Sequence, residues 1–307
     1  MRILVTGANG FVGKHLCKVL SDNNTEVMAI VRRTCNDLTS IADQYEVDIT
    51  DRSLVENVLA DIKPDHIVHL AAAKNKGTAL ADYRTNYEVN LLGTLNLIDA
   101  CHGLTKMSKF LYIGSCEEYG NQQVPFKESI KESPISAYGV SKLAVVNLLQ
   151  ALVATRNFPA VILRPSVVYG PGQDMDMFLP SLIRALVSGE RFGMSLGKQT
   201  RDFLYIDDLL SAILKALVEP GLQGKVINIS AGLPIQIDAL AMKIASLIGP
   251  DVGNRIDFGA IEYRHAEVMS YCANNELAQD LLGWAPKISI EEGLKITIDY
   301  FSSCAEG

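Results

Sequence analysis

Apolar and polar positions alternate in blocks along the first half of the chain. Short apolar runs predict buried strands, and each run is followed by a segment whose apolar residues recur every three or four positions, as on one face of a helix. Strands that alternate with helices are typical of a parallel sheet covered on both faces. The pattern therefore predicts an α/β fold with a Rossmann-type, doubly wound parallel sheet. The strands are expected at residues 3–6, 27–31, 67–70, 109–113 and 160–163, and the helices at residues 11–21, 51–62, 80–101 and 136–154.

The pattern is less regular after residue 165, where a Tyr-Gly-Pro-Gly turn interrupts the chain. Short apolar runs and helical spacing continue beyond it, without repeats or a low-complexity linker. Helices are expected at residues 177–188, 209–218, 235–248, 275–282 and 290–301, and strands at residues 203–206 and 226–229. We expect a larger domain and a smaller mixed α/β domain, built from residues 1–165 plus about 203–230 and from about 166–202 plus 231–307.

The composition is that of a globular protein without a surface for nucleic acid. Of the 307 residues, 48% are hydrophobic and 21% are charged, and the net charge is −7 with both signs scattered. The six cysteines form no CxxC or CxxH pair, so we expect free thiols in the cytoplasm and no metal site. The first residues lack a signal-peptide pattern, and the longest apolar stretch, residues 143–154, is too short to cross a bilayer. A cytoplasmic protein without membrane contact is expected.

A glycine-rich loop follows the first predicted strand. Residues 2–13 read RILVTGANGFVG, which places Gly7, Gly10 and Gly13 between a strand and a helix. Glycine permits a tight turn and a close approach of the backbone to a pyrophosphate. The helix that begins at Phe11 and Val12 offers free N–H groups and the positive end of its dipole. The arrangement of strand, loop and helix predicts a dinucleotide site.

Two arginines at the end of the second predicted strand bear on which dinucleotide binds. An acidic residue at that point would hold the ribose hydroxyls of NAD, but Arg32 and Arg33 stand there instead. Guanidinium groups attract a 2′-phosphate and can bind it bidentately. We therefore expect NADP(H) to be preferred, with NAD(H) still possible. Asp48, after the next short strand, is a candidate partner for the adenine amino group.

Three residues with catalytic potential lie on two predicted elements. Ser115 follows the strand at residues 109–113, and Tyr138 and Lys142 are four positions apart at the start of the helix at residues 136–154. Residues at this spacing share one face of a helix. A nearby ammonium lowers the pKa of a phenol, which can then act as an acid or a base near neutral pH. Together with the glycine loop, this combination is a much more specific signal than a tyrosine and a lysine at helical spacing alone.

These features resemble the extended short-chain dehydrogenase/reductases, in the sugar-nucleotide epimerase/dehydratase group. The resemblance implies that Tyr138 is the catalytic acid/base, that Lys142 supports it and binds a ribose hydroxyl, and that Ser115 orients the reacting sugar oxygen. The matching segments cover nearly the whole chain in the family's order: TGANGFVG (6–13), Asp48, HLAA (69–72), NLLGT (90–94), GSCEEYG (114–120), YGVSK (138–142), RPSVVYGPGQ (164–173), RDFLYIDDL (201–209) and YRHAEV (263–268).

The resemblance also implies contacts for two ligands. Arg201 and Arg264 match positions that bind the diphosphate of a nucleotide-sugar substrate, which suits two guanidinium groups. A homodimer formed through the two long helices is expected as well. The dinucleotide would be lined by Asp48 and Ile49, by Leu70, Ala71 and Ala72, and at the nicotinamide by Pro165, Val167 and Val168.

The residues after Ser115 bear on the reaction. In 4,6-dehydratases of this group two acidic residues follow the hydroxyl residue, whereas here the first position is Cys116 and only the second, Glu117, is acidic. Glu117 could serve as a base or hold the substrate, and the form GSxEEYG resembles that of 4-keto-6-deoxy sugar-nucleotide reductases. Glu118 is expected on the opposite face of an extended segment, without a role. Val167 stands where many members have an asparagine that contacts the substrate.

The leading hypothesis is an NADPH-dependent reductase of a nucleotide-linked 4-keto sugar, a 6-deoxy sugar by this resemblance, with Tyr138 as the proton donor. The alternative is an NAD-dependent nucleotide-sugar 4-epimerase or 4,6-dehydratase, which uses the same three residues and keeps its cofactor bound. A reductase of a non-nucleotide carbonyl compound stays open. So does a non-catalytic cofactor-binding protein, although such proteins commonly lack the tyrosine or the lysine.

Overall fold

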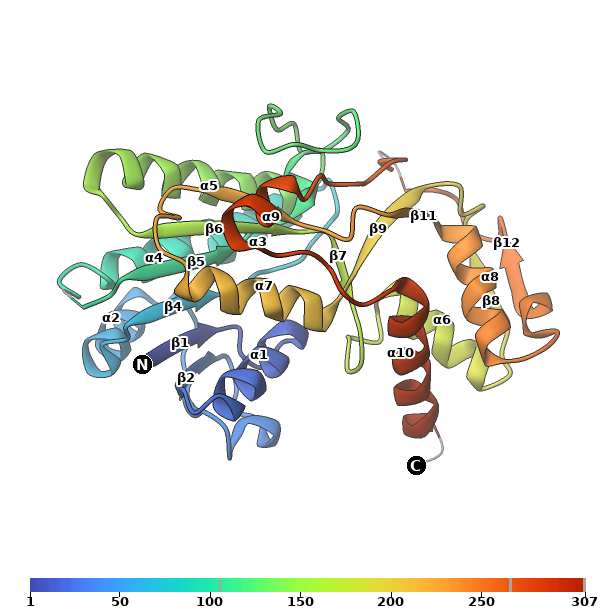
Figure 1. Cartoon of the computed structure of the whole chain (residues 1–307), viewed down its shortest axis with the longest axis horizontal. Helices are drawn as coiled ribbons and strands as arrows, with labels where there is room; N and C mark the ends of the chain where they lie inside the picture. Colours follow the sequence, from blue (N-terminus) through green and yellow to red (C-terminus); the bar gives the residue numbers. More distant parts are fainter. Residues whose placement is uncertain (105, 265–266, 306–307) are drawn as a thin grey trace.

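The computed structural model has a larger part built around one sheet and a smaller part beside it (Figure 1). It describes residues 1–104, 106–264 and 267–305. The amino terminus lies at the start of β1, within the large sheet, and the last helix belongs to the smaller part.

The large sheet has seven strands, all parallel, and it confirms the predicted Rossmann-type fold. The chain moves outward in one direction from β1 to β3 and in the other from β1 through β4, so the order reverses between β1 and β4. Ligands of such sheets bind outside the carboxyl ends of the strands at this reversal. In spatial order the strands are β10 (Val226–Ile229), β6 (Ala160–Pro165), β5 (Lys109–Ile113), β4 (His66–His69), β1 (Arg2–Thr6), β2 (Glu26–Val31) and β3 (Asp43–Glu46).

Helices cover both faces of this sheet because successive strand residues point to opposite sides. Ile3 and Val5 of β1 pack into the apolar cluster that includes α1 (Phe11–Asp22) and α7 (Ile206–Val218). Leu4, between them, packs into a separate cluster on the other face. That second face is covered by α2 (Arg52–Ile62), α4 (Gly93–Ala100) and α5 (Ala137–Arg156).

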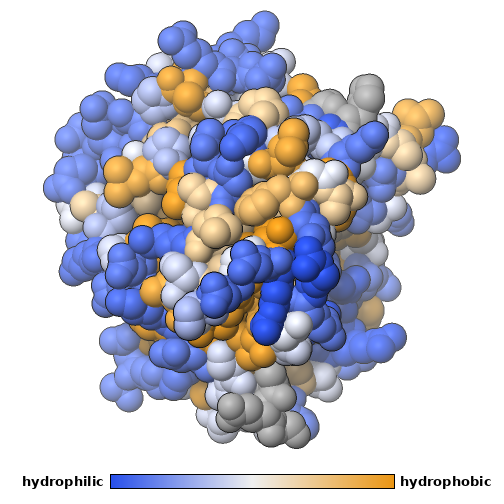
Figure 2. Space-filling model, turned by 90° about the vertical axis from the view of Figure 1, so that its right-hand side faces the viewer, coloured by the Kyte–Doolittle hydropathy of each residue, from blue (hydrophilic) through white to orange (hydrophobic). Residues whose placement is uncertain are grey.

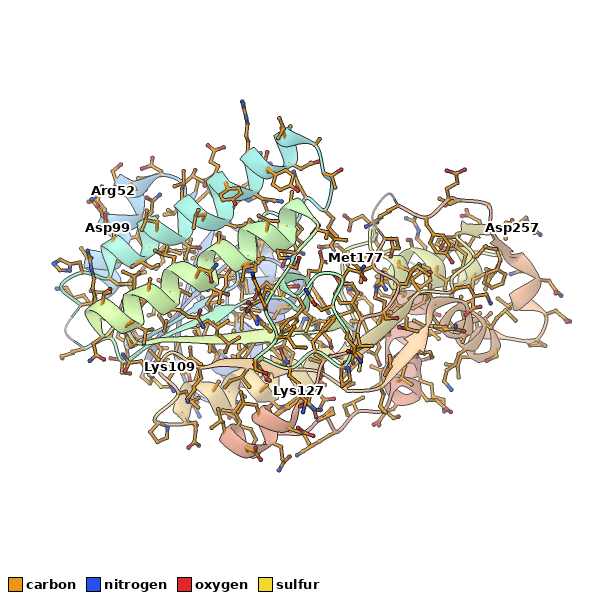
Figure 3. All side chains as sticks on the ribbon, turned by 90° about the horizontal axis from the view of Figure 1, so that it is seen from above. Arg52, Asp99, Lys109, Lys127, Met177 and Asp257 are labelled. Carbon is orange, nitrogen blue, oxygen red and sulfur yellow. The ribbon has the colours of Figure 1, made fainter. Side chains whose placement is uncertain are left out.

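The helix predicted at residues 80–101 is divided. It consists of α3 (Leu80–Asn86), a π-helical stretch at Tyr87–Leu92 and α4. This run lies beside α5 (Figure 3), and Arg52 of α2 forms an ion pair with Asp99 of α4 at 2.8 Å. Short π-helical stretches often occur at functional sites, and this one carries the buried Asn90.

Helix α5 is longer than the apolar stretch expected at residues 143–154. Its 20 residues are long and apolar enough, by length and composition alone, to cross a membrane. Val145, Val146 and Leu149 are nevertheless buried against the sheet. The packing of this face gives the apolar residues a role inside the fold.

The smaller part contains two small sheets. One has the order β11 (Pro234–Gln236), β9 (Thr200–Tyr205) and β7 (Val167–Tyr169), and the other pairs β12 (Ile256–Phe258) with β8 (Phe192–Met194). Its helices are α6 (Phe178–Val187), α8 (Ile237–Ile248), α9 (Glu276–Leu282) and α10 (Ile290–Ala305). Residues 203–205 lie in the small sheet, and the chain returns to the large sheet through α7 and β10. The domain limits given above stay a prediction.

The end of the molecule formed by the smaller part is mixed in polarity. Figure 2 shows apolar side chains in the middle of this face, surrounded by hydrophilic ones. Leu196, Phe258 and Ile261 are exposed apolar residues of this part of the chain. The Ile261 N–H donates to the Met194 carbonyl at 3.3 Å, which holds the segment after β12 beside β8.

Candidate active site

The three glycines of the loop after β1 are required by close backbone contacts. Gly7 has a φ of +67°, and a Cβ at this position would lie 2.7 Å from the Ala71 nitrogen. A Cβ on Gly13 would overlap the carbonyl oxygen of Gly7. A Cβ on Gly10 would lie 3.2 Å from the same oxygen. The loop therefore fits tightly between α1 and the segment after β4 only while these positions lack side chains.

The amino end of α1 is open to an anion. Gly10 caps the helix without a side-chain hydrogen bond, and no acidic residue lies in the first turn. The first N–H groups of a helix lack partners within it and attract phosphate. The cradle formed by the glycines and this helix end fits the pyrophosphate of a dinucleotide. Phe11 is buried and Val12 is half-buried at the start of α1.

The residues predicted to bind the adenosine end of the dinucleotide differ in exposure and in the contacts that they already make. Arg32 and Arg33 follow β2 and are exposed, and no described carboxylate lies within 4 Å of either guanidinium. Asp48 is exposed, and it accepts hydrogen bonds from the Thr50 N–H at 2.9 Å and the Thr50 hydroxyl at 2.8 Å. The Ile49 side chain is buried in the core, so only its backbone is available to a ligand.

A buried hydrogen-bond chain lies below the segment at residues 70–73. Thr6 Oγ1 lies 2.6 Å from His69 Nδ1 and accepts from the Ala71 N–H at 3.2 Å. His69 Nε2 lies 2.8 Å from Thr94 Oγ1, and the Thr94 hydroxyl donates to the Asn90 carbonyl. Because Thr94 uses its proton on Asn90, His69 must donate through Nε2 and accept at Nδ1 from Thr6. Burial lowers the pKa of His69 to about 3, so the ring is neutral.

Asn90 extends this chain to the helix that bears Tyr138. Its side chain accepts from the Ala73 N–H at 2.7 Å and donates to the Ala73 carbonyl at 3.0 Å and to Ser141 Oγ at 2.8 Å. Ser141 Oγ in turn donates to the Tyr138 carbonyl at 2.8 Å. The glycine loop, residues 70–73 and the first turn of α5 are thereby held in fixed relative positions. The Leu70, Ala71 and Ala72 side chains are half-buried along this segment.

The structure brings Ser115, Tyr138 and Lys142 together at the carboxyl ends of β5 and β6. Lys142 Nζ donates to the Ile113 carbonyl at 2.5 Å and lies 4.2 Å from the centre of the Tyr112 ring and 6.0 Å from that of Tyr138. Burial lowers the pKa of Lys142 to about 8, although the charge of Glu118 opposes the shift.

The expected lowering of the Tyr138 pKa is wrong. Burial raises the pKa of Tyr138, as do the charges of Glu117 and Glu118, and the nearby Ser115 side chain offsets this only in part. Lys142 does not counter the effect of burial, because its ammonium group bonds to the Ile113 carbonyl and lies 6.0 Å from the centre of the Tyr138 ring. A positive charge brought closer to the phenol would be needed to stabilise tyrosinate.

The prediction that Glu118 has no role is also wrong, because residues 116–118 form a 3₁₀ turn and not an extended segment. Glu118 is buried, accepts from the Ser115 N–H at 2.8 Å and pairs with Arg164. Arg164 also pairs with Glu132 at 2.7 Å. This network fixes the backbone of the residue that carries the Ser115 hydroxyl.

Cys116 and Glu117 differ in exposure. The Cys116 side chain is buried, and its thiol donates to the Arg164 carbonyl at 3.5 Å. Burial raises its pKa well above the usual range of a thiol. Glu117 is partly exposed and accepts from Lys76 at 2.5 Å and from the Ser136 hydroxyl at 3.1 Å, and its N–H donates to Ser115 Oγ at 3.1 Å.

The two arginines predicted for the diphosphate are in different environments. Arg201 is largely buried, pairs with Glu267 and lies 5.0 Å from the centre of the Tyr271 ring. Burial lowers the pKa of Arg201, while the charges of Glu267 and Glu117 oppose this. Arg264 is exposed and directly precedes residues 265 and 266, which lie outside the described residues.

The predicted nicotinamide-side residues lie where the two parts of the chain meet. Pro165 is buried at the end of β6, and Val167 and Val168 are half-buried in β7. The Gln173 side chain donates to the Val168 carbonyl at 2.9 Å, which fixes the turn after β7.

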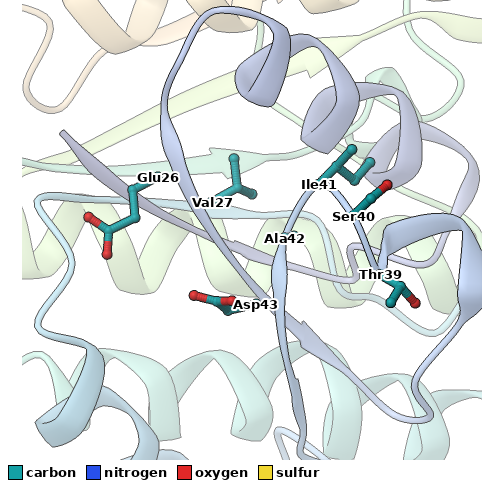
Figure 4. Close-up of a pocket in the computed structure, with 7 residues that line it drawn as sticks. All are labelled: Glu26, Val27, Thr39, Ser40, Ile41, Ala42 and Asp43. Carbon is teal, nitrogen blue, oxygen red and sulfur yellow. The ribbon is translucent and has the colours of Figure 1, made fainter.

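A hollow of about 220 Å³ lies elsewhere, between the start of β2 and residues 39–43 (Figure 4). Glu26, Val27 and Asp43 line it at the amino ends of β2 and β3, opposite the carboxyl ends that carry the loop and Ser115. We therefore assign it no part in the reaction. Within residues 1–104, 106–264 and 267–305, no three His, Cys, Asp or Glu side chains are grouped to hold a metal ion.

Sequence reasoning did not find several residues of this site. Lys76 and Ser136 hold Glu117, and Thr6, His69, Asn90 and Ser141 form the buried chain. Thr6, His69 and Asn90 lie in segments that matched the family, so they could have been singled out. Lys76 lies in a loop whose sequence shows no motif, and only the fold brings it to Glu117.

Comparison with known proteins decides the family. The sequence profile of the NAD dependent epimerase/dehydratase family matches residues 3–230. The chain belongs to this family. The glycine cradle and the three polar residues at the sheet edge therefore belong to an NAD(P)-dependent enzyme that modifies nucleotide sugars.

Similar proteins in this family carry out different reactions. The chain is 29% identical to the dTDP-D-glucose 4,6-dehydratase of Bos taurus, over 98% of this chain and 88% of that protein. It is also 29% identical to the GDP-6-deoxy-D-mannose reductase of Pseudomonas aeruginosa, over 98% and 97%. The structure of UDP-glucose 4-epimerase from Thermotoga maritima, with UDP-glucose, matches with a TM-score of 0.92 at 27% identity, over 99% of each chain. An epimerase and a dehydratase among these relatives favour the alternative hypothesis over net reduction.

Proposed function

We propose that this enzyme is a nucleotide-sugar 4-epimerase that keeps its NAD(P) bound through the reaction. The observation that carries the proposal is that Ser115, Tyr138 and Lys142 meet near the glycine cradle, while the part of the chain that the structure describes places no second acid suited to dehydration beside them. The likeness to the UDP-glucose 4-epimerase of Thermotoga maritima supports it.

The residues after Ser115 argue against a dehydratase. Loss of water from a sugar needs one group that removes a proton and another that protonates the departing hydroxyl. Cys116 is buried with its thiol on the Arg164 carbonyl, so it does not face a substrate. Glu117 has one oxygen on Lys76 and the other on Ser136. Neither residue is arranged as a free acid.

The residues of the chain supply the proton steps of an epimerisation. Tyr138 removes the proton of the sugar's 4-hydroxyl. After the 4-keto sugar has rotated to present its other face to the cofactor site, Tyr138 returns the proton. Ser115 holds the same oxygen, and Lys142 stabilises the tyrosinate. When bound, NAD(P) would supply the oxidation of C4 and its return to the alcohol. The glycine cradle and the amino end of α1 would hold its pyrophosphate.

Net reduction by NADPH is the second candidate. Exposed Arg32 and Arg33 stand where an acid would hold the ribose of NAD, and an exchangeable NADPH suits an enzyme that consumes reductant. The likeness to the GDP-6-deoxy-D-mannose reductase supports this candidate.

The cofactor found in the purified protein separates the two candidates. The protein is denatured, the released dinucleotide is identified by mass, and its ratio to protein is measured. About one NAD(P) per chain supports the epimerase. An empty site that takes up NADPH, followed by its oxidation with a nucleotide-linked 4-keto sugar, would replace the epimerase with the reductase.

A further inference from the structure

The ion pair between Glu117 and Lys76 lies next to the catalytic serine, because Glu117 belongs to the short turn that Ser115 caps. Lys76 comes from the segment after β4, and Glu117 comes from the turn after β5. The Ala137 N–H donates to the Gly77 carbonyl at 3.2 Å, which fixes the Lys76 segment to the start of α5. The ion pair therefore joins two loops, and the loop that carries Lys76 is itself held to the start of α5.

The carboxylate is the deeper partner of this pair. The Glu117 side chain is 22% exposed and that of Lys76 is 41% exposed. The charge of Glu117 contributes to the raised pKa of both Tyr138 and Tyr271, after burial as the larger cause. Glu117 thus lies within electrostatic reach of the reacting group and of the Tyr271 ring on which Arg201 lies. The Glu117 N–H also donates to Ser115 Oγ at 3.1 Å, so Glu117 adjoins the hydroxyl that is proposed to hold the sugar oxygen.

Both oxygens of Glu117 are already used by donors from the protein. Lys76 binds Oε1 and Ser136 binds Oε2, and the Ser136 hydroxyl itself accepts from the Gly139 N–H at 3.0 Å. These partners hold a carboxylate, which can accept a further hydrogen bond but donates none. A sugar hydroxyl can provide that bond, whereas a sugar carboxylate would be repelled.

We propose that Glu117, held by Lys76 and Ser136, restricts the substrate to nucleotide-linked hexoses and deoxyhexoses and excludes hexuronates. This inference rests on the proposed function, because it takes Tyr138 as the residue at C4. It gives Glu117 a role in specificity and not in proton transfer. Like charges placed together at a binding site weaken binding.

The test compares equilibrium binding of UDP-glucose and UDP-glucuronate to the holoenzyme by calorimetry, so it does not depend on turnover. We expect wild-type protein to bind UDP-glucose at least about tenfold more tightly, given the cost of like charges in partly exposed sites. Glu117→Gln should reduce this ratio about tenfold by removing the repulsion, and Lys76→Met should increase it by leaving the carboxylate unpaired. If the ion pair only supported the loop structure, the two substitutions would not change the binding ratio in opposite directions.

Lys74→Met is the matched control. Lys74 lies two residues away, forms an exposed pair with Asp174 at 3.5 Å and loses the same charge on substitution, so the binding ratio should not change. Equal binding of the two sugars to wild-type protein, or an unchanged ratio in Glu117→Gln, would overturn the inference and leave the proposed function standing. If neither UDP-glucose nor dTDP-glucose nor GDP-glucose bound, the proposed function would fail, and the inference with it.

Discussion

The Nε2–H of His69 donates to Thr94 Oγ1 at 2.8 Å, deep in the core between β4 and α4. Because the Thr94 hydroxyl donates to the Asn90 carbonyl, the direction of every bond in the chain from Ala71 to Asn90 is determined. His69 is therefore held as one neutral tautomer. It joins the end of β1, which begins the glycine loop, to the π-helical stretch that carries Asn90.

This relationship predicts how stability depends on pH. The unfolded chain protonates His69 near its ordinary pKa of 6.5, but burial lowers the pKa in the folded protein to about 3. Between these values the unfolded state binds more protons, so stability falls as the pH falls, by at most about 1.4 kcal/mol per pH unit from this group. His69→Gln should reduce that slope when unfolding by urea is measured between about pH 4.5 and pH 6.5.

The exposed His102 supplies the control for this measurement. His102→Gln should leave the slope of the wild-type protein unchanged, because it removes no buried ring. A slope that stayed the same in His69→Gln would contradict the neutral, buried state of His69. Nitrogen chemical shifts of the labelled histidine provide a second check, since Nε2 should carry the proton.

Gly13→Ala should abolish dinucleotide binding. The new Cβ would overlap the Gly7 carbonyl, and backbone atoms cannot rotate away as a flexible side chain can. We expect the variant to lose the bound cofactor and also about 1–3 kcal/mol of stability, the usual cost of overpacking a core. Gly249→Ala is the control, because its Cβ would lie at an ordinary 3.6 Å from Val252. Cofactor content after gel filtration decides the outcome.

Tyr138→Phe should lower kcat by about 10²–10⁴-fold, the usual contribution of a positioned acid or base. The substitution removes the phenol hydroxyl and keeps the ring beside Lys142. Bound dinucleotide and nucleotide-sugar affinity should change little, and both are measured on the same preparation. A variant that turned over at the wild-type rate would remove Tyr138 from the reaction.

Replacing both Arg32 and Arg33 by alanine should weaken NADP⁺ binding and leave NAD⁺ binding nearly unchanged. Only NADP⁺ has the 2′-phosphate that these exposed guanidiniums can bind. Titration of cofactor-free protein with each dinucleotide at low and high salt measures the effect, which should decrease as salt screens the charges. If both dinucleotides weakened equally, the arginines would not be selecting the 2′-phosphate.

The exposed leucines of the helical run α3–α4 test the expected homodimer. Leu92 and Leu95 are 52% and 42% exposed, next to the apolar helix α5. Leu92→Glu should convert a dimer to a monomer in light scattering, because it places a charge in an apolar interface. Leu233→Glu, at an exposed site of the smaller part, is the control. A wild-type protein that is monomeric at micromolar concentration would contradict the expectation.

Local pattern predicted much of the fold. The alternation of strands and helices is a short-range feature, and the seven-stranded parallel sheet confirms the fold that it implies. The glycine loop and the spacing of Tyr138 and Lys142 are also short-range features of the sequence. The small strands β7, β8, β11 and β12 escaped prediction because each has three residues, too few to show a period. The segment after Ser115 was misjudged because a 3₁₀ turn reverses the expected direction of Glu118.

The sequence predicted which residues form the site better than it predicted their ion pairs and pKa shifts. Residues far apart in the sequence determine them: Lys142 bonds to the Ile113 carbonyl, and Lys76 pairs with Glu117 across 41 residues. A motif gives the side chains but not the atoms that they contact. The raised pKa of Tyr138 is a consequence of burial that no spacing reveals.

The most direct test of the central claim uses a nucleotide-linked hexose that carries deuterium at C4, incubated with the purified enzyme without added dinucleotide. The account predicts that the 4-epimer forms, that deuterium is retained at C4 of the product, and that no dinucleotide is consumed. The account would be contradicted if no epimer formed and the enzyme did one of two other things. It could oxidise added NADPH stoichiometrically with a 4-keto sugar, or it could convert the hexose to a 4-keto-6-deoxy sugar with loss of water.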